Sequence, residues 1–228
     1  MQSINAVIFD LDGVIVSTDE FHFLAWKTLA DHHKIPFDRE DNERLRGVSR
    51  MESLEIIQEK SPTRFSPSEK EKMAEVKNAY YRESLKRLTP ADILPGVLEA
   101  LAELSTRGIK VAIGSSSRNA ATILAAIGLS DAFDSVVDGT HISRSKPDPE
   151  VFTLAASRLG VASANCLVVE DAEAGVDAGL AAGMRVLAVG PARIHPRAGL
   201  KAENLTFITV DEMLFISGAA RSPLTRTP

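Results

Sequence analysis

The chain has 228 residues, of which 44% are apolar and 25% are charged, a balance that is ordinary for a globular protein with a sizeable core. Its net charge of -5 argues against general nucleic-acid binding, because such proteins present an excess of positive charge. No apolar run is long enough to span a bilayer, no secretory signal is visible, and the single Cys166 cannot form an internal disulfide, so we expect a cytoplasmic protein without membrane partners.

The first predicted element is a buried strand, Ala6-Val7-Ile8-Phe9, that leads directly into the acidic residues Asp10 and Asp12. The run is too short for a helix and is rich in branched side chains. Carboxylates at the end of a buried strand are unfavourable unless they bind a cation or take part in chemistry. Their i, i+2 spacing places them on one side of an extended chain, and ligands of parallel sheets bind beyond the strand ends. We therefore expect Asp10 and Asp12 to begin an active site.

The next segment, residues 15–90, carries only helical signals. Apolar side chains recur at helical spacing near its start. Ser49 and Glu52 form a capping box, and Pro67 occupies the first position of a long polar helix. We therefore predict an all-helical cap over residues 15–94, joined to the core by two short connections that act as a hinge.

After the predicted cap, strand and helix signals alternate to the end of the core. Strands are expected at residues 110–114, 135–137, 166–169 and 185–189, with a helix in each interval. This alternation with short connections predicts a parallel sheet that is covered on both faces. The expected fold is thus α/β, a doubly wound, Rossmann-like parallel sheet with an inserted helical cap. The core would comprise residues 1–14 and 95–217, and residues 218–228 would form a flexible tail.

Several polar residues at predicted strand ends have the chemistry that phosphoryl transfer requires: a nucleophile, a cation and donors for the phosphoryl oxygens. Asp10 offers a carboxylate nucleophile. Glu170 and Asp171 follow a second apolar strand, so the two strand ends are able to share a hard cation such as Mg²⁺. Ser115 ends another strand just before a helix, where a hydroxyl and free N–H groups suit a phosphate oxygen.

Two further residues complete this predicted chemistry. Lys146 lies in a loop directly before two prolines, Pro147 and Pro149, and its charge would offset that of a phosphoryl group and Asp10. Asp12 is close enough to Asp10 to transfer a proton to or from the oxygen that releases or receives phosphate.

Each of these candidate residues also has a purely structural interpretation. The aspartate pair fits an acidic loop after a core strand, and Asp171 fits an N-cap at a helix start, where acids are favoured. Serines before helices, such as Ser115, are common caps, and Lys146 fits an ordinary surface lysine.

The motif Phe9-Asp10-Leu11-Asp12-Gly13-Val14 resembles the nucleophile motif of the haloacid dehalogenase superfamily of phosphotransferases. The aspartate pair, serine, lysine and acidic pair also follow that superfamily's order over nearly the whole predicted core. The resemblance implies one Mg²⁺, held by Asp10, Asp171 and the backbone carbonyl of Asp12, with Glu170 as a further candidate ligand. The chain departs from some members at Ala172, which cannot donate the side-chain hydrogen bond of a hydroxyl residue.

Parts of the predicted cap resemble the β-phosphoglucomutase family more narrowly. Residues 18–27 are similar to its hinge and first cap helix, residues 45–50 to its substrate-specificity loop, and Lys77-Asn78 to a pair that faces the sugar. Arg50 and residues 117–119 match positions that hold the phosphate farther from the nucleophile, a task that suits the guanidinium fork. The substrate-binding residues that the resemblance implies are Thr18, His22, Trp26, Gly47, Val48, Ser49, Arg50, Lys77, Ser116, Ser117 and Asn119.

The resemblance implies a Mg²⁺-dependent mutase that interconverts β-D-glucose 1-phosphate and D-glucose 6-phosphate. Its route would pass through a phosphoaspartate at Asp10 and through β-glucose 1,6-bisphosphate, which also serves as the activating phosphoryl donor. We expect a monomer. The alternatives are a sugar-phosphate phosphatase, a mutase that acts on a disaccharide phosphate, and a non-catalytic binding module on the same fold. Within the cap, Trp26 and His22 also fit an ordinary packed interior, and Arg50 an exposed charge.

Overall fold

The computed structural model describes residues 3–45 and 48–215. Within these ranges, six strands form one sheet in the order β3-β2-β1-β4-β5-β6, and each neighbouring pair is parallel. The strands are β1 (Ala6–Phe9), β2 (Lys110–Gly114), β3 (Ser135–Val137), β4 (Cys166–Glu170), β5 (Arg185–Ala188) and β6 (Leu200–Lys201). The predicted doubly wound parallel sheet is confirmed, and β6, which has two residues, is an addition to the prediction.

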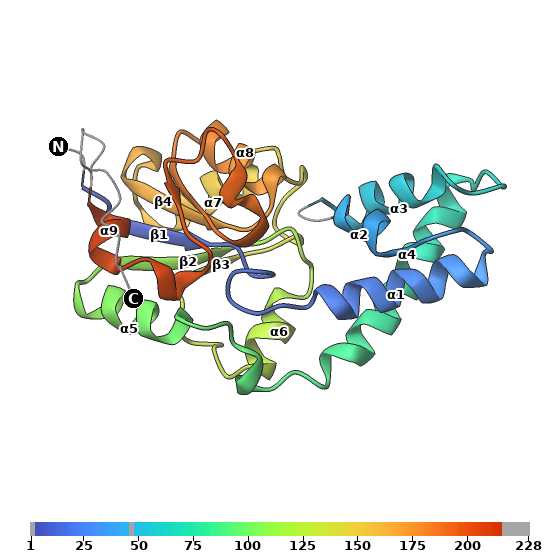
Figure 1. Ribbon diagram of the computed structural model, residues 1–228, viewed down its shortest axis with the longest axis horizontal. Coiled ribbons are helices and arrows are strands. Elements are labelled where there is room, and N and C mark those ends of the chain that lie inside the picture. The colour runs from blue at the N-terminus through green and yellow to red at the C-terminus, as the bar shows by residue number, and fades with distance from the viewer. Residues whose placement is uncertain (1–2, 46–47, 216–228) are drawn as a thin grey trace, which may run out of the picture.

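Helices cover both faces of this sheet (Figure 1). One face packs against α5 (Val97–Thr106), α6 (Ala120–Ala126) and α9 (Val210–Leu214), and the other against α7 (Glu150–Leu159) and α8 (Glu173–Ala181). Short 3₁₀ turns lie in some of the connections: η1 (Pro90–Asp92), η2 (Ser163–Asn165), η3 (Gly190–Ile194) and η4 (Leu205–Phe207). Because side chains alternate along a strand, β1 contributes Val7 and Phe9 to one apolar cluster and Ala6 and Ile8 to the other. This two-sided burial explains the uninterrupted apolar run of β1.

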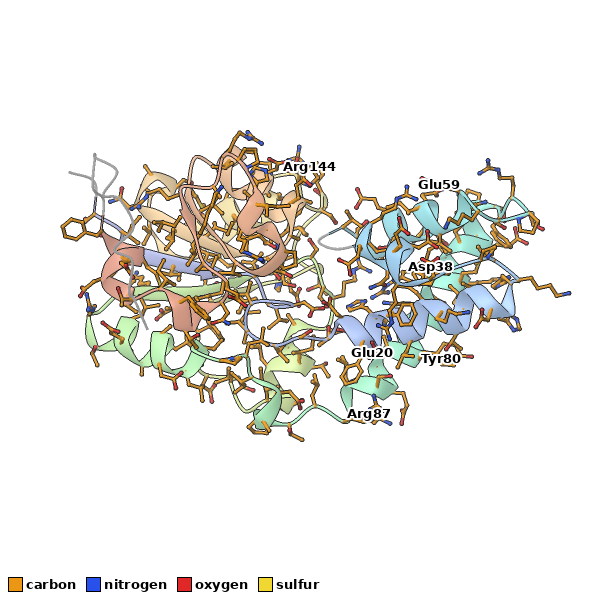
Figure 2. The ribbon with its side chains drawn as sticks, viewed as in Figure 1. Glu20, Asp38, Glu59, Tyr80, Arg87 and Arg144 are labelled. Carbon is orange, nitrogen blue, oxygen red and sulfur yellow. The ribbon has the colours of Figure 1, made fainter. Side chains whose placement is uncertain are left out.

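The chain between β1 and α5 forms a helical lobe, the predicted cap, beyond the carboxyl ends of the strands (Figure 1). It consists of α1 (Asp19–His32), α2 (Arg39–Glu43), α3 (Arg50–Gln58) and α4 (Pro67–Leu85). The lobe has an apolar cluster of its own, which includes Trp26, Leu54 and Met73. Charged side chains such as Glu59 and Arg87 lie on its outside (Figure 2).

Local signals account for where the cap helices begin. The predicted capping box of α3 is present, with the Ser49 N–H donating to Glu52 at 2.8 Å and the Glu52 N–H donating to Ser49 at 3.2 Å. Helix α4 begins with Pro67 after the N-cap Ser66, as expected for a residue whose missing N–H costs nothing there. No helix of the described ranges is long and apolar enough to cross a membrane.

The two chain segments that connect the lobe to the sheet run side by side. Val16 and Ile93 form an antiparallel bridge, and the Leu94 N–H donates to the Ile15 carbonyl at 2.9 Å. The lobe is therefore attached through one narrow double connection. The domain boundaries at residues 14/15 and 94/95, and the hinge action of this connection, stay predictions; the expected tail at residues 218–228 lies outside the described ranges.

We predict that Gly114→Ala lowers the free energy of unfolding by about 1–3 kcal/mol, because overpacking a tight core forces neighbouring atoms to shift. A Cβ at this position of β2 would lie 2.8 Å from a ring carbon of Phe152 and 3.1 Å from a methyl group of Ile8. The matched control is Gly199→Ala, where the nearest atom, the Val186 carbonyl oxygen, is 3.9 Å away. Urea denaturation of both variants tests the prediction, and equal stability of the two proteins would contradict it.

Candidate active site

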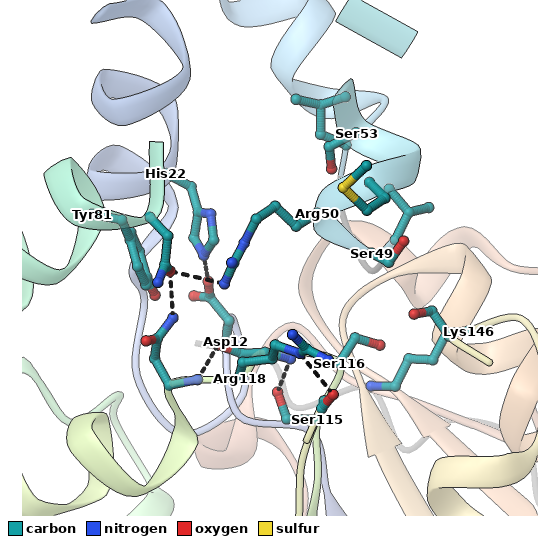
Figure 3. Close-up of a pocket in the computed structure, with 18 of the residues that line it drawn as sticks. Asp12, His22, Ser49, Arg50, Ser53, Tyr81, Ser115, Ser116, Arg118 and Lys146 are labelled. Atoms are coloured by element: carbon teal, nitrogen blue, oxygen red, sulfur yellow. Dashed lines mark hydrogen bonds and ion pairs between the residues drawn. The ribbon is translucent and has the colours of Figure 1, made fainter. Parts of the chain in front are cut away.

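A cavity of about 590 Å³ lies between the carboxyl ends of the central strands and the inner side of the cap. Figure 3 shows His22 and Arg50 pointing into it from the cap, opposite Asp12, Ser115 and Lys146. Most of the residues that the sequence singled out line this one cavity: Asp10, Asp12, His22, Trp26, Val48, Ser49, Arg50, Lys77, Ser115, Ser116, Ser117, Asn119, Lys146, Glu170 and Asp171. Thr18 lies directly behind it in contact with Asp12, and Gly47 falls outside the described residues.

Lys146 is the buried cation of the strand-end side of the site. Its side chain is 1% exposed, and its Nζ donates to Asp10 Oδ1 and, at 2.8 Å, to Glu170 Oε2. Burial disfavours the ammonium, but the charges of Asp10 and Glu170 outweigh that effect and hold the pKa of Lys146 above its usual value. The interpretation of Lys146 as a surface residue is therefore wrong.

Asp10, Glu170 and Asp171 fit a hard cation. Each offers a carboxylate oxygen within 4.8 Å of the others, and all three residues are buried. Gly13, with φ of +84°, passes so close to Asp171 that a Cβ there would overlap its carboxylate, and a Cβ at Gly175 would overlap that of Glu170. Oxygen ligands of this type, set in a space that glycines keep open, suit Mg²⁺.

Glu170 has additional partners on the protein itself. Its Oε1 accepts the backbone N–H groups of Asp171 at 3.2 Å and Ala172 at 3.0 Å. Burial raises the pKa of Glu170, while Lys146 and the Ala172 N–H oppose the shift. The N-cap of α8 is Ala172, so the alternative interpretation of Asp171 as the helix cap is wrong.

Asp12 is held by the residue that precedes α1. Its Oδ1 accepts the Thr18 N–H at 2.6 Å, and its Oδ2 accepts the Thr18 hydroxyl at 2.5 Å. Burial raises the pKa of Asp12 to about 7, with a further contribution from the charge of Asp19, whereas the hydrogen bonds from Thr18 oppose the shift. Asp12 is thus a carboxylate that takes up a proton unusually easily and whose two oxygens have fixed directions.

His22 and Lys77 form a pair beside Asp12, in which Lys77 is buried and His22 is half-buried. Lys77 is 3% exposed, its Nζ lies 2.7 Å from His22 Nδ1, and the Trp26 and Tyr81 rings lie 4.7 Å from it. Burial, and then the charge of Lys77, hold the pKa of His22 well below its usual value; burial, and then Arg50, do the same to the pKa of Lys77. The two ring nitrogens of His22 thus face different groups: Nδ1 faces Lys77, and Nε2 lies 3.7 Å from Asp12 Oδ2.

The other side of the cavity is rich in positive charge. Arg50, the first residue of α3, is half-buried, and its pKa is lowered by burial and then by the nearby Arg118. Its guanidinium donates to Asn78 Oδ1 at 2.8 Å, and the Asn119 amide donates to the same oxygen at 3.1 Å. Among residues 3–45 and 48–215, neither Arg50 nor Arg118 forms an ion pair with a carboxylate. The site therefore holds two guanidinium groups near each other without a matching acid, as an anion-binding site would.

The serine run after β2 leaves hydroxyl groups available at the cavity. Ser115 Oγ accepts the Ser117 N–H at 3.1 Å, and Ser117 Oγ accepts the Asn119 N–H at 3.2 Å, so both hydroxyl protons are free to donate. Ser116 Oγ is buried and has no hydrogen-bond partner within the described part of the chain. A buried hydroxyl of this kind is costly unless a ligand satisfies it.

Sequence reasoning did not single out Tyr81, which also lines the cavity. Its ring lies 4.1 Å from that of His22, and its hydroxyl lies 2.8 Å from Thr18 Oγ1. The signal that would have found it is its spacing: Tyr81 is four residues after Lys77 and therefore lies on the same face of the helix.

A second group with metal-ligand chemistry, Glu173, Asp177 and His195, lies apart from this cavity. His195 Nδ1 accepts the Arg197 N–H at 3.3 Å, so its proton is on Nε2, which faces Asp177 at 3.3 Å. The Arg197 guanidinium binds the same carboxylate. The group is accordingly an ion-pair cluster, because its histidine presents a proton where a metal would need a lone pair.

The chain is similar to known proteins over almost its whole length. The sequence model of the haloacid dehalogenase-like hydrolases matches residues 4–183. β-Phosphoglucomutase of Bacillus subtilis is 44% identical over 208 residues, which make up 90% of this chain and 92% of that protein. A phosphorylated carbohydrates phosphatase of Thermotoga maritima is 32% identical over 213 residues, 92% of this chain and 96% of that one. The crystal structure of β-phosphoglucomutase from Clostridium difficile has a TM-score of 0.84 and 41% identity, over 89% of this chain and 92% of that chain.

We predict that Lys146→Met lowers the free energy of unfolding by about 3–5 kcal/mol, because removing one partner of a buried ion pair leaves buried charge uncompensated. The measurement is urea denaturation in the presence of a chelator, so that no metal ion replaces the lost positive charge. Lys86→Met is the control, since Lys86 and its partner Glu83 are both more than 70% exposed. A loss no larger than that of the control would show that Asp10 and Glu170 do not depend on Lys146.

Proposed function

The chain belongs to the β-phosphoglucomutase family of the haloacid dehalogenase-like hydrolases, and we propose that it interconverts β-D-glucose 1-phosphate and D-glucose 6-phosphate. The observation that carries the proposal is that one cavity is lined by the carboxylate of Asp10 and by the guanidinium groups of Arg50 and Arg118, which form no ion pair with a carboxylate of residues 3–45 and 48–215. A mutase must hold two phosphate groups at once, whereas a phosphatase needs one phosphate site. Arg50 and Arg118 supply the positive charge for the second.

Asp10 is the proposed nucleophile. Its carboxylate attacks the phosphorus of the sugar bisphosphate in line, and the bond from phosphorus to the sugar oxygen breaks. Asp12 gives its proton to that oxygen, and in the opposite direction it takes the proton from the sugar hydroxyl that attacks the phosphoaspartate. β-Glucose 1,6-bisphosphate is both the intermediate and the donor that first phosphorylates Asp10. The sugar turns around between the two transfers, so each of its phosphates reacts at Asp10 once.

The remaining residues of the site bind and orient the sugar phosphate. Lys146 and Ser115 offset charge on the reacting phosphoryl group, and Arg50, Ser117 and Asn119 hold the distant phosphate. Mg²⁺, one per subunit, would be held by Asp10, Asp171 and the Asp12 carbonyl, with Glu170 as a further candidate, and when bound it neutralises charge between the nucleophile and the phosphate. The other proposed contacts of the sugar phosphate are Thr18, His22, Trp26, Val48, Ser49, Lys77 and Ser116. We propose that the protein acts as a monomer.

A sugar-phosphate phosphatase is the second candidate, favoured by the similarity to the Thermotoga maritima phosphatase. It would use Asp10 in the same way, but water would attack the phosphoaspartate. Closure of the cap over both phosphates is what would exclude water from a mutase site. The two functions therefore differ in the fate of the phosphoaspartate.

The deciding experiment is a product assay with β-D-glucose 1-phosphate, Mg²⁺ and a catalytic amount of β-glucose 1,6-bisphosphate. We predict that D-glucose 6-phosphate forms without an equivalent release of inorganic phosphate, and that a chelator stops the reaction until Mg²⁺ is restored. Asp10→Asn should reduce turnover by orders of magnitude while circular dichroism shows an intact fold, because the amide retains the shape but not the nucleophile. Stoichiometric phosphate release would favour the phosphatase, and normal turnover by Asp10→Asn would exclude Asp10 as nucleophile.

We further predict that Arg50→Ala selectively impairs the mutase reaction. A lost hydrogen bond to a charged group is worth roughly 1.5–3 kcal/mol, which corresponds to about a ten- to hundredfold fall in kcat/KM. Hydrolysis of acetyl phosphate, which has one phosphate, should change little, so the quantity to compare is the ratio of the two rates.

The control for this comparison is Arg64→Ala, which removes an exposed arginine of the cap that does not line the cavity. A parallel fall of both rates in Arg50→Ala would mean that Arg50 serves the reacting phosphate or the fold. If neither rate falls, the distant phosphate site is elsewhere.

A further inference from the structure

The side chain of Tyr81 lies beside Asp12, where the cap meets the core (Figure 3). Tyr81 belongs to α4 and is 1% exposed, and its hydroxyl oxygen lies 2.8 Å from Thr18 Oγ1. The Thr18 hydroxyl in turn donates to Asp12 Oδ2 at 2.5 Å. A continuous chain of hydrogen bonds therefore connects a cap helix to the proposed proton donor of the core.

The number of hydroxyl protons fixes which group donates in each of these two hydrogen bonds. A threonine hydroxyl has one proton, and Thr18 gives it to Asp12, so the bond between Thr18 and Tyr81 has to be donated by Tyr81. Burial holds the pKa of Tyr81 above its usual range, which keeps that donor protonated. As long as Tyr81 donates, the Thr18 hydroxyl cannot turn its own proton away from Asp12 without losing a bond.

We propose that Tyr81 is a positioning residue for proton transfer: its hydroxyl holds the Thr18 side chain in the orientation that donates to Asp12, and thereby fixes the Asp12 carboxylate. The inference deepens the proposed function, on which it rests in assigning the proton of the sugar oxygen to Asp12. The hydroxyl of Tyr81 contacts Thr18 and its ring contacts His22 and Lys77, so removing the hydroxyl alone affects the contact with Thr18. Its effect should therefore be confined to steps in which Asp12 moves a proton.

The leaving group of the substrate decides whether phosphorylation of Asp10 depends on a proton from Asp12. A sugar oxygen that leaves phosphorus needs a proton, so its departure depends on Asp12. Acetyl phosphate releases acetate, which is stable as an anion and needs no proton. Phosphorylation of Asp10 by acetyl phosphate thus tests the nucleophile, Lys146 and the cation while bypassing Asp12.

The test is Tyr81→Phe, which removes one oxygen and retains the ring that packs 4.1 Å from His22. We expect kcat for the sugar phosphate to fall roughly five- to tenfold, the effect of losing one hydrogen bond between neutral groups, with KM little changed. The rate of Asp10 phosphorylation by acetyl phosphate should stay at the wild-type value. Tyr80→Phe is the matched control, because Tyr80 is the neighbouring tyrosine of α4, is 48% exposed, and lies on the outside of the cap (Figure 2).

A double-mutant cycle with Thr18→Val shows whether Tyr81 acts through Thr18. Valine keeps the shape of threonine but has no hydroxyl, so adding Tyr81→Phe to Thr18→Val should cause no further loss. Additive losses would overturn the proposal, as would an equal fall of the acetyl phosphate reaction or an unchanged kcat in Tyr81→Phe. The proposal is separable from the mutase assignment: if wild-type protein hydrolyses the sugar phosphate instead, the same comparisons are made on that hydrolysis, in which the sugar oxygen also leaves.

Discussion

Charge balance at the ends of β1 and β4 is the constraint on which the rest of the structure depends. Asp10, Glu170 and Asp171 are buried together, and Lys146 reaches between Asp10 and Glu170 from a loop far along the chain. Carboxylates in such a setting need cations and N–H donors, since burial of unpaired charge is strongly unfavourable. The lysine and the N–H groups at the end of β4 meet part of this need, and the proposed divalent ion would meet the rest. The same requirement makes the strand ends suited to a phosphoryl group, which is itself an anion that needs cations.

The cap supplies the second half of the site through two antiparallel helices. Thr18 and His22 lie one turn apart at the start of α1, and their partners Tyr81 and Lys77 lie one turn apart on α4. The four side chains form two adjacent contacts that both end at Asp12 Oδ2. Packing of α1 on α4 therefore fixes the surroundings of a core carboxylate, so cap geometry and proton transfer are coupled by contact. This coupling is the physical reason why a movement of the cap would alter the chemistry below it.

The positive charge at the far side of the cavity distinguishes the two candidate functions in physical terms. Arg50 and Arg118 repel each other, and burial makes the Arg50 guanidinium less favourable still. Asn78 offers both Arg50 and Asn119 a neutral acceptor, which keeps these donors directed to one point. Such an arrangement is unfavourable without an anion and gains stability when one binds. A second phosphate on the substrate is the simplest anion that would use it.

The sequence by itself determined the elements and the residue types at their ends. The apolar run of residues 6–9, the capping box at Ser49 and the strand–helix alternation are local patterns, and the parallel α/β sheet predicted from them is confirmed. It also predicted which residues would matter chemically, because carboxylates at the ends of buried strands are unfavourable without a cation or a chemical role. Their assigned roles stay predictions, but the structure brings almost all of them to one cavity.

Only the tertiary structure decided which of these residues meet. The order of strands, with β1 between β2 and β4, places Asp10 beside Asp171. The spacing of apolar residues along the sequence contains no information about which strands are neighbours in the sheet. Strand β6 has two residues, which are too few to show an alternation of apolar and polar side chains in the sequence. The contact of Tyr81 with Thr18 spans 63 residues and depends on how two helices pack. Local propensity fixes each element, but contacts between distant elements follow from packing the whole chain, and for this reason Tyr81 became apparent only in the folded protein.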